Sequence, residues 1–314
     1  MAAIDGIFDP KATTLPVLRY LVALADHHHF GRAAAACGVS QPTLSAQIQQ
    51  WERRMAMQAF ERSGSGVRTT PAGERVVAQA RAALAALEAL EHAAGTATPP
   101  FFGPVRLGVI PTVGPYALPF LAHALEARWP DLDLPIVEGT TAEMVERLDR
   151  GRIDLALMAV MPGLDAGHEV VALYDEPFLA ALPKRHALAR ADEVTPAELA
   201  GERLLLLDEG HCLREQALEL CRLRGDARRT GADYGATSLE TLKSLVALGR
   251  GVTLLPALAT GDDERIALRP ISGRRTRRTI AVYWRRNDPR GDAYRELASV
   301  MRTSVPRDRV QPAR

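Results

Sequence analysis

Two cysteines in the second half of the chain have the surroundings of a redox-active thiol site. The run LLLLDEGHCLREQALELC places Cys212 after an apolar strand and a glycine, at the start of a helical segment that also holds Cys221. A helix N-terminus favours an anion, and His211 and Arg214 add hydrogen-bond donors or positive charge. These neighbours favour the thiolate of Cys212, which is the form that attacks a peroxide and becomes a sulfenic acid.

The spacing of these two cysteines sets a condition on any bond between them. Nine positions separate Cys212 from Cys221, which on an α-helix is a rise of about 13.5 Å and about half a rotation. A disulfide requires Cα atoms within about 7 Å, so these thiols can be joined only if the helix unravels. Such a bond would record a change of conformation. The alternative is that both cysteines are buried small apolar residues.

A second group of polar side chains lies in the run SQPTLSAQIQQ, residues 40–50. Leu44, Ile48 and Trp51 are spaced four and three apart, so they form one inward face of a helix and leave hydroxyls and amides outward. Such side chains contact bases and phosphates, and nearby arginines suit phosphate contacts, although a solvated charged face is the alternative. The predicted DNA-binding residues are Arg32, Ser40, Gln41, Pro42, Thr43, Ser45, Gln47, Arg53, Arg62 and Arg68.

The elements around this helix predict a DNA-binding domain over residues 12–70. An amphipathic helix begins near Leu15, and two shorter helical runs meet at Gly38 and Val39, with Ser40 as the N-cap of the second run. Two helices joined by a tight glycine turn form a helix-turn-helix. The segment RSGSGVRTTPAG predicts a small hairpin, or wing, so the domain is a winged helix-turn-helix.

A long helix is predicted over residues 71–95, followed by the linker TATPP at 96–100. Its small and apolar positions repeat four and three apart, at Val76, Ala80, Ala83, Leu87, Leu90 and Ala94. This seam suits pairing between two chains, and we predict a linker and dimerisation helix. The alternative is a helix that packs only on its own domain.

Residues 101–302 predict an α/β effector domain. Short apolar strands such as VRLGVI, IDLALMAV and RTIAVYW alternate with helical runs, which is typical of Rossmann-like units with a mainly parallel sheet. The length suffices for two lobes, with crossovers near 175–185 and near 275, and a ligand is expected in the crevice between them. The Arg- and Pro-rich tail at 303–314 is predicted to be disordered.

Composition limits the class of protein. The chain has 314 residues, a net charge of +1 and three cysteines, so it is not a secreted disulfide framework, and its charge gives no sign of nucleic acid. No segment resembles a membrane span or a signal peptide, and we predict a cytoplasmic protein. His27, His28 and His29 lie in one loop and their rings point in different directions, so neither a metal nor a cofactor is predicted.

The DNA-reading segment closely resembles a known family. The run FGRAAAACGVSQPTLSAQIQQWE followed by RTTPAGE is similar to the winged helix-turn-helix of LysR-type transcription regulators. The resemblance implies a homodimer or homotetramer on double-stranded operator DNA, contact with RNA polymerase, no enzymatic activity, and a two-lobed effector domain like that of periplasmic binding proteins. Trp51 and Ala56 depart from the family pattern, which usually has a leucine and a helix-ending glycine there.

The effector region is similar to the hydrogen-peroxide-sensing members of this family. The similarity is carried by GHCLREQALELC, IPTVGPY and ATSLETLKSLVALGRGVTLLPALA, and it extends over residues 14–300. It implies that Cys212 is the peroxidatic cysteine, that Cys221 is the resolving one, and that a thiol reductant of the glutaredoxin or thioredoxin type restores them. It also implies a peroxide pocket formed by Thr112, Thr141, His211 and Arg278.

The chemistry of that pocket suits the resemblance but leaves choices open. Hydroxyls and a guanidinium can hold both peroxide oxygens and stabilise the leaving oxygen. Thr140 and Arg277 have the same chemistry as their neighbours Thr141 and Arg278, and each threonine of the pocket can instead cap a helix. Two other functions are kept as alternatives: a regulator that senses a small metabolite in the crevice, and a thiol peroxidase. The first predicts that a thiol-free variant still responds, whereas the peroxide sensor predicts that Cys212→Ser abolishes the response.

Overall fold

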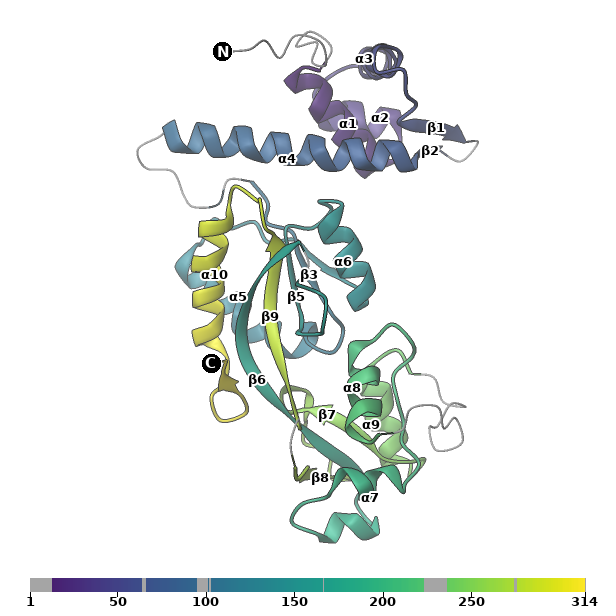
Figure 1. Ribbon diagram of the computed structural model, residues 1–314, viewed down its shortest axis with the longest axis vertical. Helices are drawn as coiled ribbons and strands as arrows, with labels where there is room; N and C mark the ends of the chain where they lie inside the picture. The colour runs from purple at the N-terminus through teal and green to yellow at the C-terminus, as the bar shows by residue number, and fades with distance from the viewer. Residues whose placement is uncertain are drawn as a thin grey trace. The chain divides into compact units, whose positions relative to one another are not determined.

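A computed structural model of the chain describes residues 13–63, 66–94, 101, 103–165, 167–222, 236–273 and 276–313 (Figure 1). The chain divides into two compact units. The first comprises Met1–Phe102 with Asp149–Arg152 and Asn287–Arg290, and the second comprises the remainder.

The first unit contains the predicted helix-turn-helix. Its helices are α1 (Leu15–His27), α2 (Phe30–Ala36) and α3 (Gln41–Arg54), and they share one core in which Leu44, Ile48 and Trp51 are buried as predicted. Gly38 has a φ of 68°, a left-handed conformation that glycine adopts without steric cost, so the tight turn depends on it. The Ser40 hydroxyl accepts a hydrogen bond from the Thr43 amide at 3.3 Å, which confirms Ser40 as the N-cap of α3.

The wing and the long helix follow in the same unit. Strands β1 (Phe60–Ser63) and β2 (Gly66–Thr69) form the predicted antiparallel hairpin. Helix α4 (Pro71–Ala94) begins where Thr70 accepts a hydrogen bond from the Gly73 amide at 2.9 Å. A Cβ atom at Gly73 would lie 2.0 Å from the Ala59 carbonyl oxygen, so only glycine permits this approach of α4 to the wing.

Helix α4 uses part of its apolar seam within its own chain. It packs against α1, and Ala80 is 2% exposed, whereas Leu90 near its other end is 66% exposed. The linker at 96–100 lies outside the described residues.

The second unit is built from two lobes. The first lobe contains β3 (Leu107–Val109), α5 (Gly114–Arg128), β4 (Ile136–Glu138), α6 (Thr141–Asp149), β5 (Leu155–Ala159) and, after the second lobe, α10 (Gly291–Ser304). The second lobe contains the short helices η1 (Ala187–Arg190) and η2 (Ala257–Ala259), α7 (Pro196–Ala200), α8 (Cys212–Leu220), α9 (Leu239–Ala247), β7 (Thr253–Pro256) and β8 (Ile266–Pro270).

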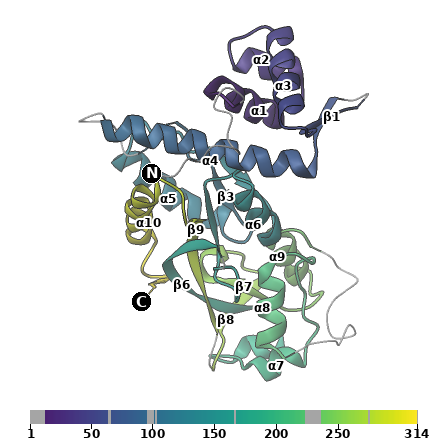
Figure 2. The same ribbon diagram turned by 45° about the horizontal axis from the view of Figure 1, so that its top comes forward.

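Two long strands connect these lobes, as Figure 2 shows. Strand β6 (His168–Pro183) pairs with β9 (Arg277–Arg285) along its first part and with β7 and β8 along its last part. They confirm the crossovers predicted near residues 175–185 and 275. Strands β6 and β9 run antiparallel to every strand with which they pair.

Antiparallel pairing is therefore more extensive than expected. Among the described strands, β3 pairs in parallel with β4 and β5, and the remaining pairings are antiparallel. The apolar strand expected before Cys212 forms only isolated parallel bridges, at Leu204 with Val252 and at Leu207 with Ala236. The sheet is mixed, and the prediction of a mainly parallel sheet was wrong.

The tail also differs from its prediction. Residues Gln311–Pro312 form strand β10, which pairs with β6. Val305 and Val310 are 4% and 2% exposed, so two apolar side chains anchor a segment that its Arg and Pro content indicated to be disordered. None of the helices in the described part of the chain is long and apolar enough to cross a membrane.

Candidate functional site

Cys212 is the first residue of α8, and its thiol is buried. It is 6% exposed, and His211 directly before it is 9% exposed and makes no side-chain cap. Leu213 and Ala217 fix the helix in the apolar core of the second lobe. Cys212 thus lies at the N-terminal end of α8, the end of a helix that favours a negative charge.

Cys221 caps the opposite end of the same helix. Its side chain belongs to the core of the second lobe, and burial raises the pKa of its thiol to about 11. Both cysteines are free thiols in this structure. At neutral pH Cys221 is therefore protonated, and it is a poor nucleophile while α8 is intact.

The end of α8 carries backbone strain. Arg222, the residue after Cys221, has a φ of 53°, a left-handed conformation that costs a non-glycine residue about 1 kcal/mol or more. The helix itself is only nine residues long, a length at which a helix depends on packing for its stability. A short helix with a strained end is easier to unravel from that end.

Arg278 is buried and paired. Its Nε donates to the Glu176 carboxylate at 2.9 Å, and its two terminal nitrogens donate to the hydroxyl and the carbonyl of Thr112 at 2.9 and 2.8 Å. Glu176 also accepts from the Leu258 amide at 2.8 Å. The guanidinium thus orients Thr112, and Glu176 balances its charge.

Arg277 and Arg278, which the sequence left equivalent, differ in exposure. Arg277 is exposed and donates to the Gln311 side chain at 3.3 Å, whereas Arg278 is 3% exposed. Arg278 is the inward residue because side chains alternate between the two faces of a strand.

The two threonines before α6 are separated in the same way. The Thr140 amide donates to the Glu143 carboxylate at 2.8 Å, and the Thr140 hydroxyl accepts from the Glu143 amide, so Thr140 is the cap. The Thr141 hydroxyl is buried and has no hydrogen-bond partner among the described residues. A buried hydroxyl of this kind is suited to a small polar ligand.

His211 lies among carboxylates but carries little charge at neutral pH. Burial lowers its pKa, and the nearby Asp208, Glu138 and Glu143 oppose that shift. The imidazole is therefore a neutral hydrogen-bonding group. Arg214 donates to the Leu207 carbonyl oxygen at 3.0 Å. Of these two residues only Arg214 carries a positive charge at neutral pH, because a guanidinium stays protonated while it donates to a carbonyl oxygen.

Two tyrosines near this site were not predicted from the sequence. Burial raises the pKa of Tyr283 to about 12, and the charges of Asp165 and Cys212 add smaller contributions to that shift. Tyr116 lies within the motif IPTVGPY, and its hydroxyl donates to Glu240 at 3.0 Å. The alternation of β9 makes Tyr283 and Ala281 point the same way, but only the three-dimensional structure identifies their neighbours.

The predicted DNA-reading residues lie mostly on one exposed part of the first unit. Gln41, Pro42, Thr43, Gln47 and Arg53 on α3 are exposed, and Ser45 is partly exposed. Ser40 is used as a cap, and its hydroxyl lies 2.8 Å from that of Thr43.

Three of the predicted arginines belong to other elements than α3. Arg32 donates to the His27 carbonyl oxygen at 2.8 Å, Arg68 forms an exposed ion pair with Glu61 at 3.2 Å, and Arg62 lies in β1. The first two side chains therefore already have partners within the protein.

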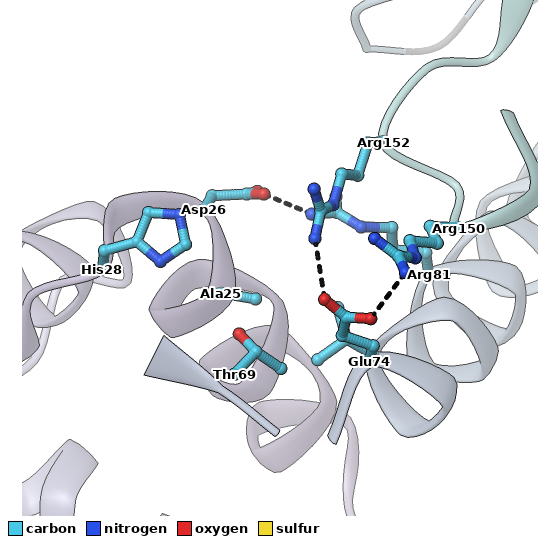
Figure 3. Close-up of a pocket in the computed structure, with 9 residues that line it drawn as sticks. Ala25, Asp26, His28, Thr69, Glu74, Arg81, Arg150 and Arg152 are labelled. Atoms are coloured by element: carbon cyan, nitrogen blue, oxygen red, sulfur yellow. Dashed lines mark hydrogen bonds and ion pairs between the residues drawn. The ribbon is translucent and has the colours of Figure 1, made fainter. Parts of the chain in front are cut away.

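The histidine loop has a structural role. The Nδ1 atom of His29 accepts from the amides of Gly31 and Arg32 at 3.0 and 3.4 Å and caps α2. In the same unit Asp26 of α1 forms an ion pair with Arg81 of α4, beside a pocket that Thr69 also lines (Figure 3). None of the predicted thiol-site residues lines this pocket.

Comparisons with known proteins assign both parts of the chain. Residues 15–74 match the model of the bacterial regulatory helix-turn-helix protein, lysR family, and residues 100–306 match the LysR substrate binding domain. The DNA-binding transcriptional dual regulator OxyR of Escherichia coli is 41% identical over 291 residues, which cover 92% of this chain and 94% of the relative. A probable hydrogen peroxide-inducible genes activator of Streptomyces viridosporus is 41% identical over 94% of this chain and 95% of its own.

Solved structures give the same result. A full-length OxyR from Pseudomonas aeruginosa with a cysteine-to-aspartate substitution has a TM-score of 0.83 and 37% identity, and the match covers 93% of this chain and 98% of that one. A peroxide-bound OxyR mutant of Corynebacterium glutamicum has a TM-score of 0.62 and 33% identity, over 95% of this chain and 93% of that one. The named relatives are transcription regulators.

Proposed function

This chain belongs to the LysR family of bacterial transcription regulators, and on that basis we propose that it senses hydrogen peroxide through Cys212. The observation that carries the proposal is the placement of two free cysteines at opposite ends of one short helix. The names of the relatives, which include hydrogen peroxide-inducible genes activators, and the peroxide-bound relative structure support the choice of signal.

The proposed reaction has two steps. The Cys212 thiolate attacks one peroxide oxygen, the O–O bond breaks, and the leaving hydroxide takes a proton to become water, which leaves a sulfenic acid. The Cys221 thiol then attacks the Cys212 sulfur, a disulfide forms, and a second water leaves. Hydrogen peroxide is the only oxidant that these two steps require.

The order of these steps follows from the environments of the two thiols. Cys212 lies at a helix N-terminus, which favours its thiolate, whereas burial keeps Cys221 protonated. Cys221 becomes reactive when α8 unravels and exposes it. The first step is thus the sensing step, and the second stores the signal as a changed conformation.

The proposed peroxide pocket comprises Thr112, Thr141, His211 and Arg278. Arg278 orients the Thr112 hydroxyl, and the Thr141 hydroxyl is buried without a partner among the described residues, so each threonine can donate to or accept from a peroxide oxygen. His211 is a neutral donor or acceptor beside the thiol. Arg278 acts mainly by holding Thr112 and by its positive field, because it is already bonded to Glu176.

The proposed output is a change in DNA binding. The domains are residues 12–70 for operator recognition, 71–95 for dimerisation, and 101–302 for redox sensing. Helix α4 supports pairing of two chains because Leu90, a large apolar residue of its seam, is exposed. We include in the proposal a homodimer or homotetramer in the cytoplasm, RNA polymerase as a partner, and a thiol reductant of the glutaredoxin or thioredoxin type.

One paired measurement tests this function. Purified protein is treated with stoichiometric hydrogen peroxide, and the same samples are analysed by thiol mass spectrometry and by an operator-binding assay. We expect a Cys212–Cys221 disulfide together with altered DNA binding, both absent in Cys212→Ser and both present in the control Cys37→Ser.

Other outcomes support other functions. A response of Cys212→Ser to a small metabolite would favour metabolite sensing. Sustained turnover of peroxide with a reductant would favour a thiol peroxidase.

A further inference from the structure

Tyr116 extends from one lobe of the effector domain to the other. It lies near the start of α5 in the first lobe, yet its side chain packs against the apolar core of the second lobe. Its hydroxyl donates to the Glu240 carboxylate at 3.0 Å, and Glu240 is in the first turn of α9. A negative side chain is favourable at that end of a helix, so Glu240 is held where Tyr116 reaches it.

Lys243 completes this contact. Its ammonium lies 2.5 Å from the Glu240 carboxylate and 5.7 Å from the centre of the Tyr116 ring. It also donates to the Ala259 carbonyl oxygen at 3.1 Å, and its side chain is only 16% exposed. The Tyr116–Glu240–Lys243 cluster therefore combines a charge-assisted hydrogen bond, an ion pair and a cation–π contact.

The cluster joins the two lobes that carry the residues of the proposed peroxide pocket. Tyr116 follows Thr112 by four residues, on the first lobe. Glu240 lies on α9. This helix shares the core of the second lobe with α8, the helix that begins at Cys212. The Tyr116–Glu240 hydrogen bond therefore connects α5, which begins after Thr112, with α9, which packs in one core with α8.

We infer that Tyr116 is a positioning residue, which through Glu240 holds Thr112 of the first lobe and Cys212 of the second at the separation that peroxide requires. This inference rests on the proposed peroxide-sensing function. A peroxide is a two-oxygen ligand held from both lobes, so its reaction depends steeply on that separation. A thiol reagent that contacts only Cys212 has no such requirement.

The test compares two reagents on the full-length chain. Second-order rate constants for loss of the Cys212 thiol are measured with hydrogen peroxide and with iodoacetamide. We expect Tyr116→Phe, which keeps the ring and removes the hydroxyl, to lower the peroxide rate about three- to tenfold and to leave alkylation unchanged. Glu240→Gln, which keeps an acceptor oxygen, should react with peroxide almost as wild type does, and Glu240→Ala should behave like Tyr116→Phe.

Ser244→Ala is the matched control. It also removes one hydroxyl, which donates to the Glu240 carbonyl oxygen at 3.0 Å within α9 and joins no lobes. If wild type reacts with peroxide, two results would overturn the inference. One is an unchanged peroxide rate in Tyr116→Phe, and the other is an equal fall in its rates with peroxide and with iodoacetamide. Wild-type Cys212 that peroxide does not consume would instead overturn the proposed function, and the inference with it.

Discussion

Cys212 is the first residue of α8, and Cys221 is the residue that caps the other end of the same helix. An intact helix holds residues of this spacing about 13.5 Å apart along its axis, well beyond the reach of a disulfide. The folded helix and the bond therefore exclude each other. Oxidation of this pair requires the second lobe to lose or rebuild one of its helices, which is the physical basis of the proposed switch.

Removal of the second thiol should separate sensing from refolding. In Cys221→Ala we expect peroxide to oxidise Cys212 to a sulfenic acid, trapped with dimedone, without a disulfide. Hydrogen exchange of residues 212–221 should then be the same before and after oxidation, whereas wild type should exchange faster once oxidised. Faster exchange in oxidised Cys221→Ala would show that the disulfide is not what unravels α8.

The left-handed residue at the end of α8 should control how easily that helix unravels. Arg222→Gly removes the strain at a φ of 53° and should stabilise the chain by about 0.5–1 kcal/mol. It should also slow disulfide formation, followed by quenched thiol labelling. Ala56→Gly is the control, because Ala56 has a φ of 49° after α3 and is remote in sequence from both thiols. An equal effect of both substitutions on the disulfide rate would contradict this account.

The buried pair of Arg278 and Glu176 should be costly to break. Each side chain is 1% exposed, so Arg278→Ala leaves a buried carboxylate without its partner and should destabilise the chain by about 3–5 kcal/mol in urea unfolding. Asp263→Asn, which breaks the exposed pair with Arg265 at 2.8 Å, is the control and should leave the unfolding midpoint unchanged. A comparable loss in both variants would mean that burial of the first pair is not what matters.

Protonation of His211 should lower the free energy of unfolding in mild acid. Its pKa is lowered from 6.5 by burial, so the unfolded chain binds a proton more readily than the folded chain. The contribution of His211 is fully present above pH 6.5 and is lost as the pH falls below 6.5 toward its folded pKa. The free energy of unfolding of wild type relative to His211→Gln should therefore decrease from pH 8 to pH 5. A difference that is constant over this range would contradict the burial of a neutral imidazole.

The exposed polar face of α3 should determine operator affinity. Gln47→Ala should weaken binding about tenfold, measured by fluorescence anisotropy at one fixed salt concentration, because an amide that reads a base edge contributes about 1–3 kcal/mol. Gln49→Ala on the same helix serves as the control, since Gln49 is also exposed but was not predicted to contact DNA. Similar losses in both variants would mean that the contact face of α3 is assigned wrongly.

The sequence by itself determined the local features of both sites. Helical spacing predicted that Leu44, Ile48 and Trp51 face inward, and the order Gly38, Val39, Ser40 predicted the turn and the cap. The position of Cys212 at the start of a helix followed from the apolar run and the glycine before it. These features depend on contacts within one or two turns, which the residue pattern encodes directly.

Only the tertiary structure decided which of two chemically equivalent neighbours points inward and which residues far apart in sequence come into contact. Thr140 is the helix cap and the Thr141 hydroxyl is buried, while Arg278 is inward and Arg277 is exposed. These outcomes depend on what packs against each face. The contact of Tyr116 with Glu240 and the pairing of β10 with β6 join segments far apart in sequence. No local periodicity specifies such pairs, because their partners are selected by the packing of whole lobes.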